Sequence, residues 1–247
     1  MTVQFHHRAE AGKQLATRLW AYADRSDVLI LALPRGGVPV GFELATALHA
    51  PLDVFLVRKL GLPGHEELAM GAIANGDIQV LNDDVVEALD IPAYVIERVA
   101  RHERQELLRR AAFYRGDRPV PEVQGRVIIL VDDGIATGST MRAAIAALRA
   151  QQPARLVVAI PTAPPDTVAS LQAEIDEVVC LITPQPFHAV GYWYRDFTQT
   201  SDAEVRDLLA WAAHDYQRVS GSVLVPTEYE SNIVTAKAER VGEDVGQ

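Results

Sequence analysis

Several short stretches of the chain are apolar at nearly every position, and polar residues gather in the segments between them. A strand with one face in water alternates apolar and polar residues, whereas a strand buried on both faces shows a continuous apolar pattern. The stretches cover residues 28–33, 52–57, 127–131, 156–160 and 178–182. Helical patterns over 38–49, 139–150 and 165–173 lie between them. This alternation predicts an α/β fold with a mostly parallel sheet flanked by helices.

Two regions interrupt the alternation. In the first, Asn75 and Gly76 stand between short apolar flanks, a pair typical of a two-residue hairpin turn. A helical pattern then runs from Pro92 to about Tyr114, and its mixed charges are typical of a solvated helix face. The second region, beyond the last apolar stretch, is rich in proline and aromatic residues and leads into a helix from about residue 202.

These patterns predict a core over residues 1–182 that contains a hairpin and helical insertion at about 72–116. A small hood region with the C-terminal helix follows over 183–220. Residues 221–247 have no sustained apolar period, so we expect a flexible tail or an arm that packs on a neighbouring molecule.

Composition narrows the class of protein. The 247 residues are 49% hydrophobic and 23% charged, which is typical of a folded globular chain. Their net charge of −10 lacks the general signature of a nucleic-acid binder. Cys180 is the single cysteine, which excludes an intramolecular disulfide, and its apolar neighbours predict a buried thiol. Neither a signal peptide nor a membrane-spanning stretch is evident, so we expect a cytoplasmic protein with no membrane partner.

The segment with the clearest chemistry follows the apolar stretch 127–131. Asp132 and Asp133 stand where the strand ends, and their carboxylates can accept hydrogen bonds from two adjacent hydroxyls, as in a ribose. A small turn then opens a helix, where backbone N–H groups and hydroxyls favour a phosphate. The residues of this turn are Ala136, Thr137, Gly138, Ser139 and Thr140. The spacing fits neither a Walker A loop nor a G-x-G-x-x-G dinucleotide fingerprint.

The segment Val-Asp-Asp-Gly-Ile-Ala-Thr-Gly-Ser-Thr, residues 131–140, resembles the 5-phosphoribosyl-1-pyrophosphate (PRPP) motif of type I phosphoribosyltransferases. The resemblance extends over about residues 5–220 and is greatest to a poorly characterised bacterial branch of predicted phosphoribosyltransferases. It implies the type I fold, a Mg²⁺ ion bound with PRPP and a homodimer. Asp132 and Asp133 would hold the ribose, with a possible contact to the metal.

Two further segments match the same family. Arg35, Gly36 and Gly37 follow the first apolar stretch and resemble its pyrophosphate loop, which implies a cis peptide bond between Pro34 and Arg35. Residues 58–71 are punctuated by glycine and proline, and we expect them to form the mobile catalytic loop of the family. Its cationic contacts to pyrophosphate would be Lys59, with Arg58.

The acceptor side is less defined, because residues 187–200 match no base-recognition segment of the better-known purine and pyrimidine enzymes closely. The aromatic residues Tyr192, Trp193, Tyr194 and Phe197 predict either a lid that stacks on a planar acceptor or a small satellite core under the last helix. Asp196 or Arg195 is a candidate for hydrogen bonding the acceptor.

The resemblance implies transfer of the phosphoribosyl group from PRPP to a nucleobase-like or other small acceptor, with release of pyrophosphate. Arg35 and Lys59 would neutralise the leaving group, and Asp132 and Asp133 would stabilise positive charge on the ribose. Two alternatives remain open: a PRPP-sensing regulator without turnover, and a hydrolase of PRPP or ribosyl phosphates.

Overall fold

The computed structural model describes residues 4–75, 78–116 and 118–221, and a five-stranded parallel sheet lies at its centre. The strand order is β2-β1-β6-β7-β8, with every neighbouring pair parallel. The strands are β1 (Val28–Ala32), β2 (Leu52–Val54), β6 (Val127–Val131), β7 (Arg155–Thr162) and β8 (Glu177–Ile182). The predicted fold class is therefore confirmed.

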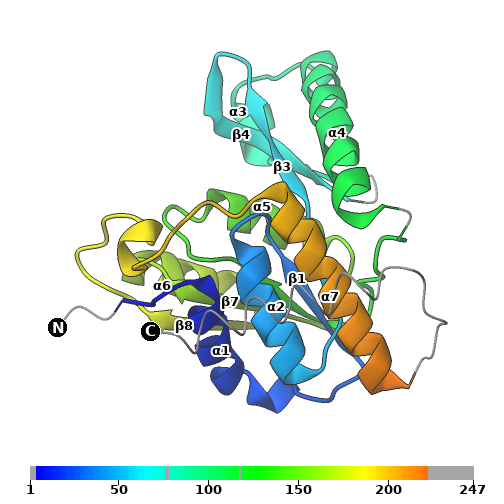
Figure 1. Cartoon of the computed structure of the whole chain (residues 1–247). Helices are drawn as coiled ribbons and strands as arrows, with labels where there is room; N and C mark the ends of the chain where they lie inside the picture. Colours follow the sequence, from blue (N-terminus) through cyan, green and yellow to red (C-terminus); the bar gives the residue numbers. More distant parts are fainter. Residues whose placement is uncertain (1–3, 76–77, 117, 222–247) are drawn as a thin grey trace.

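Helices cover both faces of this sheet (Figure 1). On one face α1 (Arg8–Arg18), α2 (Gly37–Leu48) and α7 (Asp202–Ser220) pack on the strands, and on the other α5 (Ser139–Arg149) and α6 (Pro165–Glu174) do so. Short 3-10 helices span Trp20–Tyr22 and Val190–Trp193. Among the described residues, no helix has both the length and the apolar character needed to traverse a bilayer.

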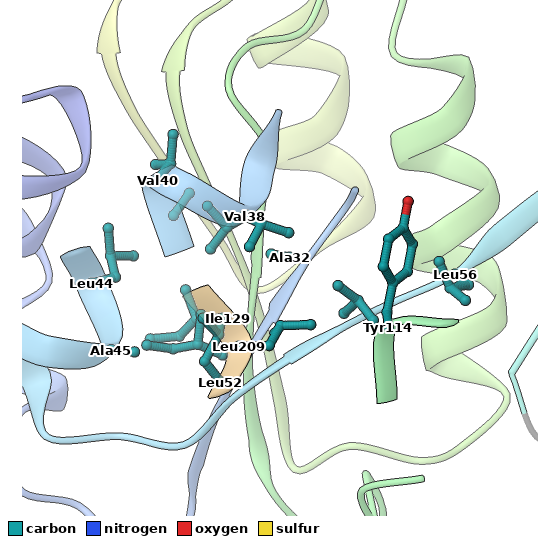
Figure 2. Close-up of a cluster of buried hydrophobic side chains, with 14 of the residues drawn as sticks. Ala32, Val38, Val40, Leu44, Ala45, Leu52, Leu56, Tyr114, Ile129 and Leu209 are labelled. Carbon is teal, nitrogen blue, oxygen red and sulfur yellow. The ribbon is translucent and has the colours of Figure 1, made fainter. Parts of the chain in front are cut away.

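Successive residues of the central strands belong to different apolar clusters. Ile129 of β6 packs with α2 and α7, whereas its neighbours Ile128 and Leu130 pack with α5. Figure 2 shows part of the first cluster, including Ile129, Leu44 of α2 and Leu209 of α7. Because both faces are buried, every position of a central strand must be apolar, which explains the continuous pattern in the sequence.

A second unit, which we call the lobe (the described residues of 57–116), projects from the carboxyl side of the sheet (Figure 1). It contains an antiparallel sheet of order β3-β4-β5, packed on a long helix. Its elements are β3 (Val57–Leu62), β4 (His65–Ala74), β5 (Ile78–Leu81), α3 (Asp83–Ala88) and α4 (Ala93–Arg115). The lobe is larger than the expected insertion at 72–116, because β4 pairs with β3 as well as with β5.

Residues 58–71 are paired strands and not the irregular loop expected, whereas their expected mobility stays a prediction. These residues form most of the β3–β4 hairpin, with a tight turn at Gly64, where φ is +83°. Leu60 and Met70 are fully buried beneath α4. These apolar side chains hold the segment as paired strands, even though glycine and proline interrupt it.

One buried ion pair joins the end of the lobe to the core. Arg115 donates from Nε to both carboxylate oxygens of Asp53 in β2, each at 3.0 Å, and from Nη2 to the carbonyl oxygen of Val54 at 2.5 Å. The side chains are only 3% and 11% exposed. A pair shielded in this way fixes the C-terminal end of α4 against β2.

Two other predictions concern the single cysteine and the turn between β4 and β5. Cys180 on β8 is half-buried, and burial raises the pKa of its thiol to about 11. The turn at Asn75 and Gly76 joins β4 to β5 as a hairpin, but its type depends on residues 76–77, outside the described residues. The predicted tail also lies outside them, apart from Gly221.

Candidate functional site

The two loops that carry the predicted chemistry meet at the carboxyl ends of β1 and β6. These strands are paired, with Ala32 opposite Val131, so the segments that follow them emerge side by side. A Cβ atom at Gly36 would lie 2.0 Å from Oδ2 of Asp133, and one at Gly37 would lie 2.7 Å from the carbonyl oxygen of Val131. The contact therefore needs glycine at both positions. The Pro34–Arg35 peptide bond is cis, as the resemblance implied.

Asp132 and Asp133 form a partly buried carboxylate pair. Burial raises the pKa of Asp132 well above its usual value, and the charge of Asp133 raises it further. Burial also raises the pKa of Asp133, against the opposing charge of Arg8. The backbone N–H of Asp133 donates to Oδ1 of Asp132 at 2.9 Å, and the Tyr194 hydroxyl donates to the Asp133 carbonyl at 2.6 Å. The first bond orients the Asp132 carboxylate, and the second holds the Asp133 backbone.

Arg8, which the sequence did not identify, is the cation beside this pair. Its Nε donates to Oδ2 of Asp133 at 2.7 Å, and its Nη1 donates to the carbonyl oxygen of Thr198 at 2.8 Å. The guanidinium carbon lies 4.0 Å from the centre of the Phe197 ring. Arg8 opens α1, more than a hundred residues before Asp133, and no local pattern links the two.

Two carbonyl groups of the turn at 136–140 accept hydrogen bonds from neighbouring side chains. Thr167 donates to the carbonyl oxygen of Ala136, and Arg142 to that of Thr137, each at 3.1 Å. Gly138 has φ of +77° at the N-cap of α5. Within the described residues, the backbone N–H groups of Ala136, Thr137 and Gly138 donate to no protein acceptor. Such a turn at a helix N-terminus offers donors to an anion.

Arg58 and Lys59 lie on opposite faces of β3 because side chains alternate along a strand. Arg58 lines a small hollow of about 40 Å³ together with Pro34 and Thr140, one residue from each core loop. Lys59 lines a different cavity of about 570 Å³, together with Ser139 and Arg142 of α5. The structure therefore brings Arg58 to the two core loops, and brings Lys59 to the flank of α5.

Arg35 lies near Asp202 of α7, which also binds Tyr114 of the lobe. Its Nη1 lies 3.9 Å from Oδ1 of Asp202, at the start of α7. The same oxygen accepts a 2.5 Å hydrogen bond from the hydroxyl of Tyr114 on α4. Burial and this bond raise the pKa of Tyr114 to about 12. Sequence reasoning missed Asp202 and Tyr114, which are neighbours only in the folded chain.

The predicted acceptor residues divide into buried and exposed ones. Trp193 and Tyr194 are 6% and 4% exposed, and Tyr194 packs with Phe5, so the satellite-core alternative describes them. In the described residues, the cluster that contains Tyr194 includes Phe5 and Ala11 of the N-terminal part, whereas the prediction placed it under the last helix. Phe197 is 37% exposed, and Asp196, which accepts two bonds from Thr198, is also exposed. Tyr192, which is 51% exposed, and Arg195 also have exposed side chains, so they are accessible to an acceptor as well.

The donor set at this site fits a metal held mainly by its ligand. In the described part of the chain, no cluster of three or more His, Cys, Asp or Glu side chains could bind an ion alone. Asp132 and Asp133 provide hard oxygen atoms at the strand end. Mg²⁺ commonly binds through one or two carboxylates, substrate phosphates and water.

Comparisons with known proteins give the family of the chain. Residues 3–194 match the model of the phosphoribosyl transferase domain family. Two Mycobacterium tuberculosis proteins, "Putative phosphoribosyl transferase MT0597" from strain CDC 1551 and "Putative phosphoribosyl transferase Rv0571c" from strain H37Rv, are each 49% identical over 212 residues. The aligned region is 86% of this chain and 48% of each relative, so the chain spans about half the length of these curated relatives. The crystal structure of TT1426 from Thermus thermophilus is similar with a TM-score of 0.77 and 42% identity, covering 84% of this chain and 98% of that one.

Proposed function

Because the chain belongs to the phosphoribosyl transferase domain family, we propose that it transfers the 5-phosphoribosyl group of PRPP to a nucleobase-like or other small acceptor and releases pyrophosphate. The observation that carries this proposal is the close contact of Gly36 with Asp133. This contact places the turn at residues 35–37, which is suited to pyrophosphate, beside the Asp132–Asp133 pair, which is suited to ribose hydroxyls.

The 5-phosphate of PRPP binds at the N-terminus of α5 in this proposal. The N–H groups of residues 136–138 have no protein acceptor among the described residues, and the hydroxyls of Thr137 and Ser139 lie 3.3 Å apart at the same turn. Thr140 extends the same set toward the hollow that Pro34 and Arg58 line. The dipole of α5 adds a favourable field for a dianion.

The carboxylate pair holds the ribose between the two phosphate-binding loops. Asp132 and Asp133 accept hydrogen bonds from adjacent ribose hydroxyls, while Arg8 keeps Asp133 in position. Positive charge grows on the ribose as its bond to pyrophosphate breaks, and a nearby carboxylate stabilises this charge. The acceptor attacks the C1 carbon as pyrophosphate departs, so the new bond replaces the broken one.

The cations at the site neutralise the leaving pyrophosphate. Arg35 and the N–H groups of Gly36 and Gly37 act from the core, and Arg58 acts from β3, whereas the expected role of Lys59 is less well supported because it lines the cavity beside Ser139. A Mg²⁺ ion held by PRPP and the Asp132–Asp133 pair would supply further positive charge against the phosphates. The acceptor would lie near Phe197 and Asp196, two of the exposed residues of the aromatic segment. The buried side chains of Trp193 and Tyr194 would pack behind this surface and hold it in place.

The test is an assay of the purified protein with PRPP, Mg²⁺ and a panel of purine and pyrimidine bases, with pyrophosphate release as the readout. Release that depends on one acceptor supports the transferase. Release without any acceptor indicates the hydrolase, and calorimetric binding of PRPP without release indicates the sensor. Failure to bind PRPP at all would contradict the proposal. Size-exclusion chromatography with light scattering tests the expected homodimer.

A further inference from the structure

Two adjacent arginines on α4 differ in what they face. Arg109 and Arg110 both form 2.9 Å ion pairs with Oε1 of Glu106. The Arg109 side chain is 68% exposed, whereas that of Arg110 is 39% exposed and lines the small hollow with Pro34 and Thr140. The charged pattern of this helix predicted a solvated face, and Arg110 departs from that pattern.

The hollow joins cations of the lobe to the loops of the core. Arg58 and Arg110 enter from the lobe, and Pro34 and Thr140 belong to the predicted pyrophosphate and phosphate turns. None of the described residues that line it is acidic. A volume of about 40 Å³ accommodates a few oxygen atoms, so an anion would place one end in the hollow and the rest at its mouth.

The guanidinium groups of Arg58 and Arg110 are each held by a glutamate through Nε, which leaves their Nη donors available to a ligand. Glu103 accepts from Nε of Arg58, and Glu106 accepts from Nε of Arg110. Among the described contacts, neither side chain has a hydrogen bond from its terminal Nη atoms. The carboxylates therefore orient the two side chains without occupying the end that recognises phosphate oxygens.

The same face of α4 also reaches Arg35. Tyr114 lies one helical turn beyond Arg110, and residues separated by four positions share a helix face. The Tyr114 hydroxyl binds the Asp202 oxygen that lies 3.9 Å from Nη1 of Arg35. Arg110 is thus directed toward the loop that carries Arg35.

We infer that Arg110, together with Arg58, binds the pyrophosphate group from the lobe, opposite Arg35 on the core. This inference rests on the proposed function. It assigns to α4 a direct part in ligand binding. The lobe then serves as one side of an anion-binding cleft whose other side is the parallel-sheet core.

The test compares Arg110→Gln with Arg109→Gln by calorimetric titration of inorganic pyrophosphate in the presence of Mg²⁺. Both variants remove one charge and one ion pair with Glu106, but only Arg110 lines the hollow. We expect Arg110→Gln to weaken binding by roughly 10- to 100-fold, since a hydrogen bond to a charged group is lost. Arg109→Gln should stay within about twofold of wild type. An Arg110→Lys variant should recover part of the loss, because it restores the charge but not the planar fork.

The outcomes separate this inference from the proposed function. If wild type binds pyrophosphate and Arg110→Gln binds it equally well, the inference is overturned and the proposed function stands. If wild type binds neither pyrophosphate nor PRPP, both are overturned. Circular dichroism of each variant, with its thermal midpoint, checks that the lobe remains folded. A loss of binding that Arg109→Gln shares equally would also overturn a specific role for Arg110.

Discussion

The parallel-sheet core and the lobe bring residues to one site in different ways. In the core, every residue of β1 and β6 is buried, and the loops that follow these strands are fixed by their pairing. In the lobe, β5 has no fully buried residue among its described positions, and α3 has none. The lobe packs through β3, β4 and α4, where Leu60, Met70 and Leu107 are buried, and polar contacts at its end add Arg115 with Asp53 and Tyr114 with Asp202.

This difference separates two tasks that a phosphoribosyltransferase site combines. In the proposed function, the ribose and 5-phosphate contacts would lie on the deeply buried frame, whereas the lobe cations Arg58 and Arg110 lie on a frame with fewer buried side chains. Elements with few buried contacts open at lower free energy than a packed core. Each variant below changes either the core or the lobe. The contributions of the core and of the lobe to stability and to ligand binding can therefore be measured separately.

The largest expected effect follows from removing the charge that anchors the lobe. Asp53→Asn would leave the buried Arg115 guanidinium without its ion-pair partner. Breaking a buried pair on one side costs about 3–5 kcal/mol, and we expect a loss of this size in the free energy of unfolding measured with urea. Asp27→Asn is the matched control, since it breaks the exposed pair with Arg25 and should cost less than about 1 kcal/mol. Equal losses in both variants would show that the anchor adds no special stability.

The next effect concerns the core half of the site. Asp133→Asn and Arg35→Ala each remove a charge aimed at the reacting group, and loss of one such contact commonly costs about 3–4 kcal/mol in the transition state. We therefore expect pyrophosphate release to fall by about two to three orders of magnitude. Asp207→Asn, at an exposed position of α7, is the control and should leave the rate unchanged. A tenfold loss or less in both site variants would argue against these roles.

Two glycine variants contrast the halves directly. In Gly36→Ala the new Cβ would stand 2.0 Å from Oδ2 of Asp133, and in Gly71→Ala it would stand 2.3 Å from the carbonyl oxygen of Val80. Overpacking of this kind typically costs about 1–3 kcal/mol. We expect Gly36→Ala to displace Asp133 and weaken PRPP binding, and Gly71→Ala to loosen the β4–β5 pair, as measured by hydrogen exchange. If Gly71→Ala leaves the exchange of β5 unchanged, the lobe is more tightly packed than its burial indicates.

The core half of the site was predictable because its determinants are local. Continuous apolar strands, a carboxylate pair at a strand end and a small turn before a helix occur together within residues 127–140. The α/β fold and the strand ends could be derived from the same pattern, because parallel strands buried on both faces leave a distinct sequence signature.

The lobe half was not predictable in the same way. Glycine and proline interrupt residues 58–71, and their pairing as strands β3 and β4 goes with the packing of Leu60 and Met70 under α4, which the local sequence does not reveal. Arg110 is one of many charges on its helix, and its position depends on how α4 crosses the core. The Arg8 contact with Asp133 likewise depends on tertiary structure. Such pairings are set by the arrangement of whole elements, for which short sequence windows carry no signal.

The smallest expected effect concerns the pH dependence of the free energy of unfolding. We expect a core carboxylate, Asp132, and a lobe carboxylate, Glu106, to change it with opposite signs. Burial raises the pKa of Asp132, so the folded protein binds this proton more tightly than the unfolded chain. Its contribution to stability is therefore lost as the pH rises above the ordinary carboxyl value of 3.8. Asp132→Asn cannot ionise, and we expect its stability relative to wild type to increase between pH 5 and pH 7 in magnesium-free urea unfolding.

Glu106 in the lobe provides the opposite case. Hydrogen bonds from Arg109 and Arg110 lower its pKa to about 2, so its contribution is present above the ordinary value of 4.5 and is lost as the pH falls toward 2. Glu106→Gln should therefore be slightly less stable than wild type at pH 7, whereas Asp132→Asn should be more stable. Both variants remove one negative charge, so a simple effect of net charge would shift them in the same direction. A shift of equal sign in the two variants would contradict this division between a core carboxylate placed for ligand binding and a lobe carboxylate placed for structure.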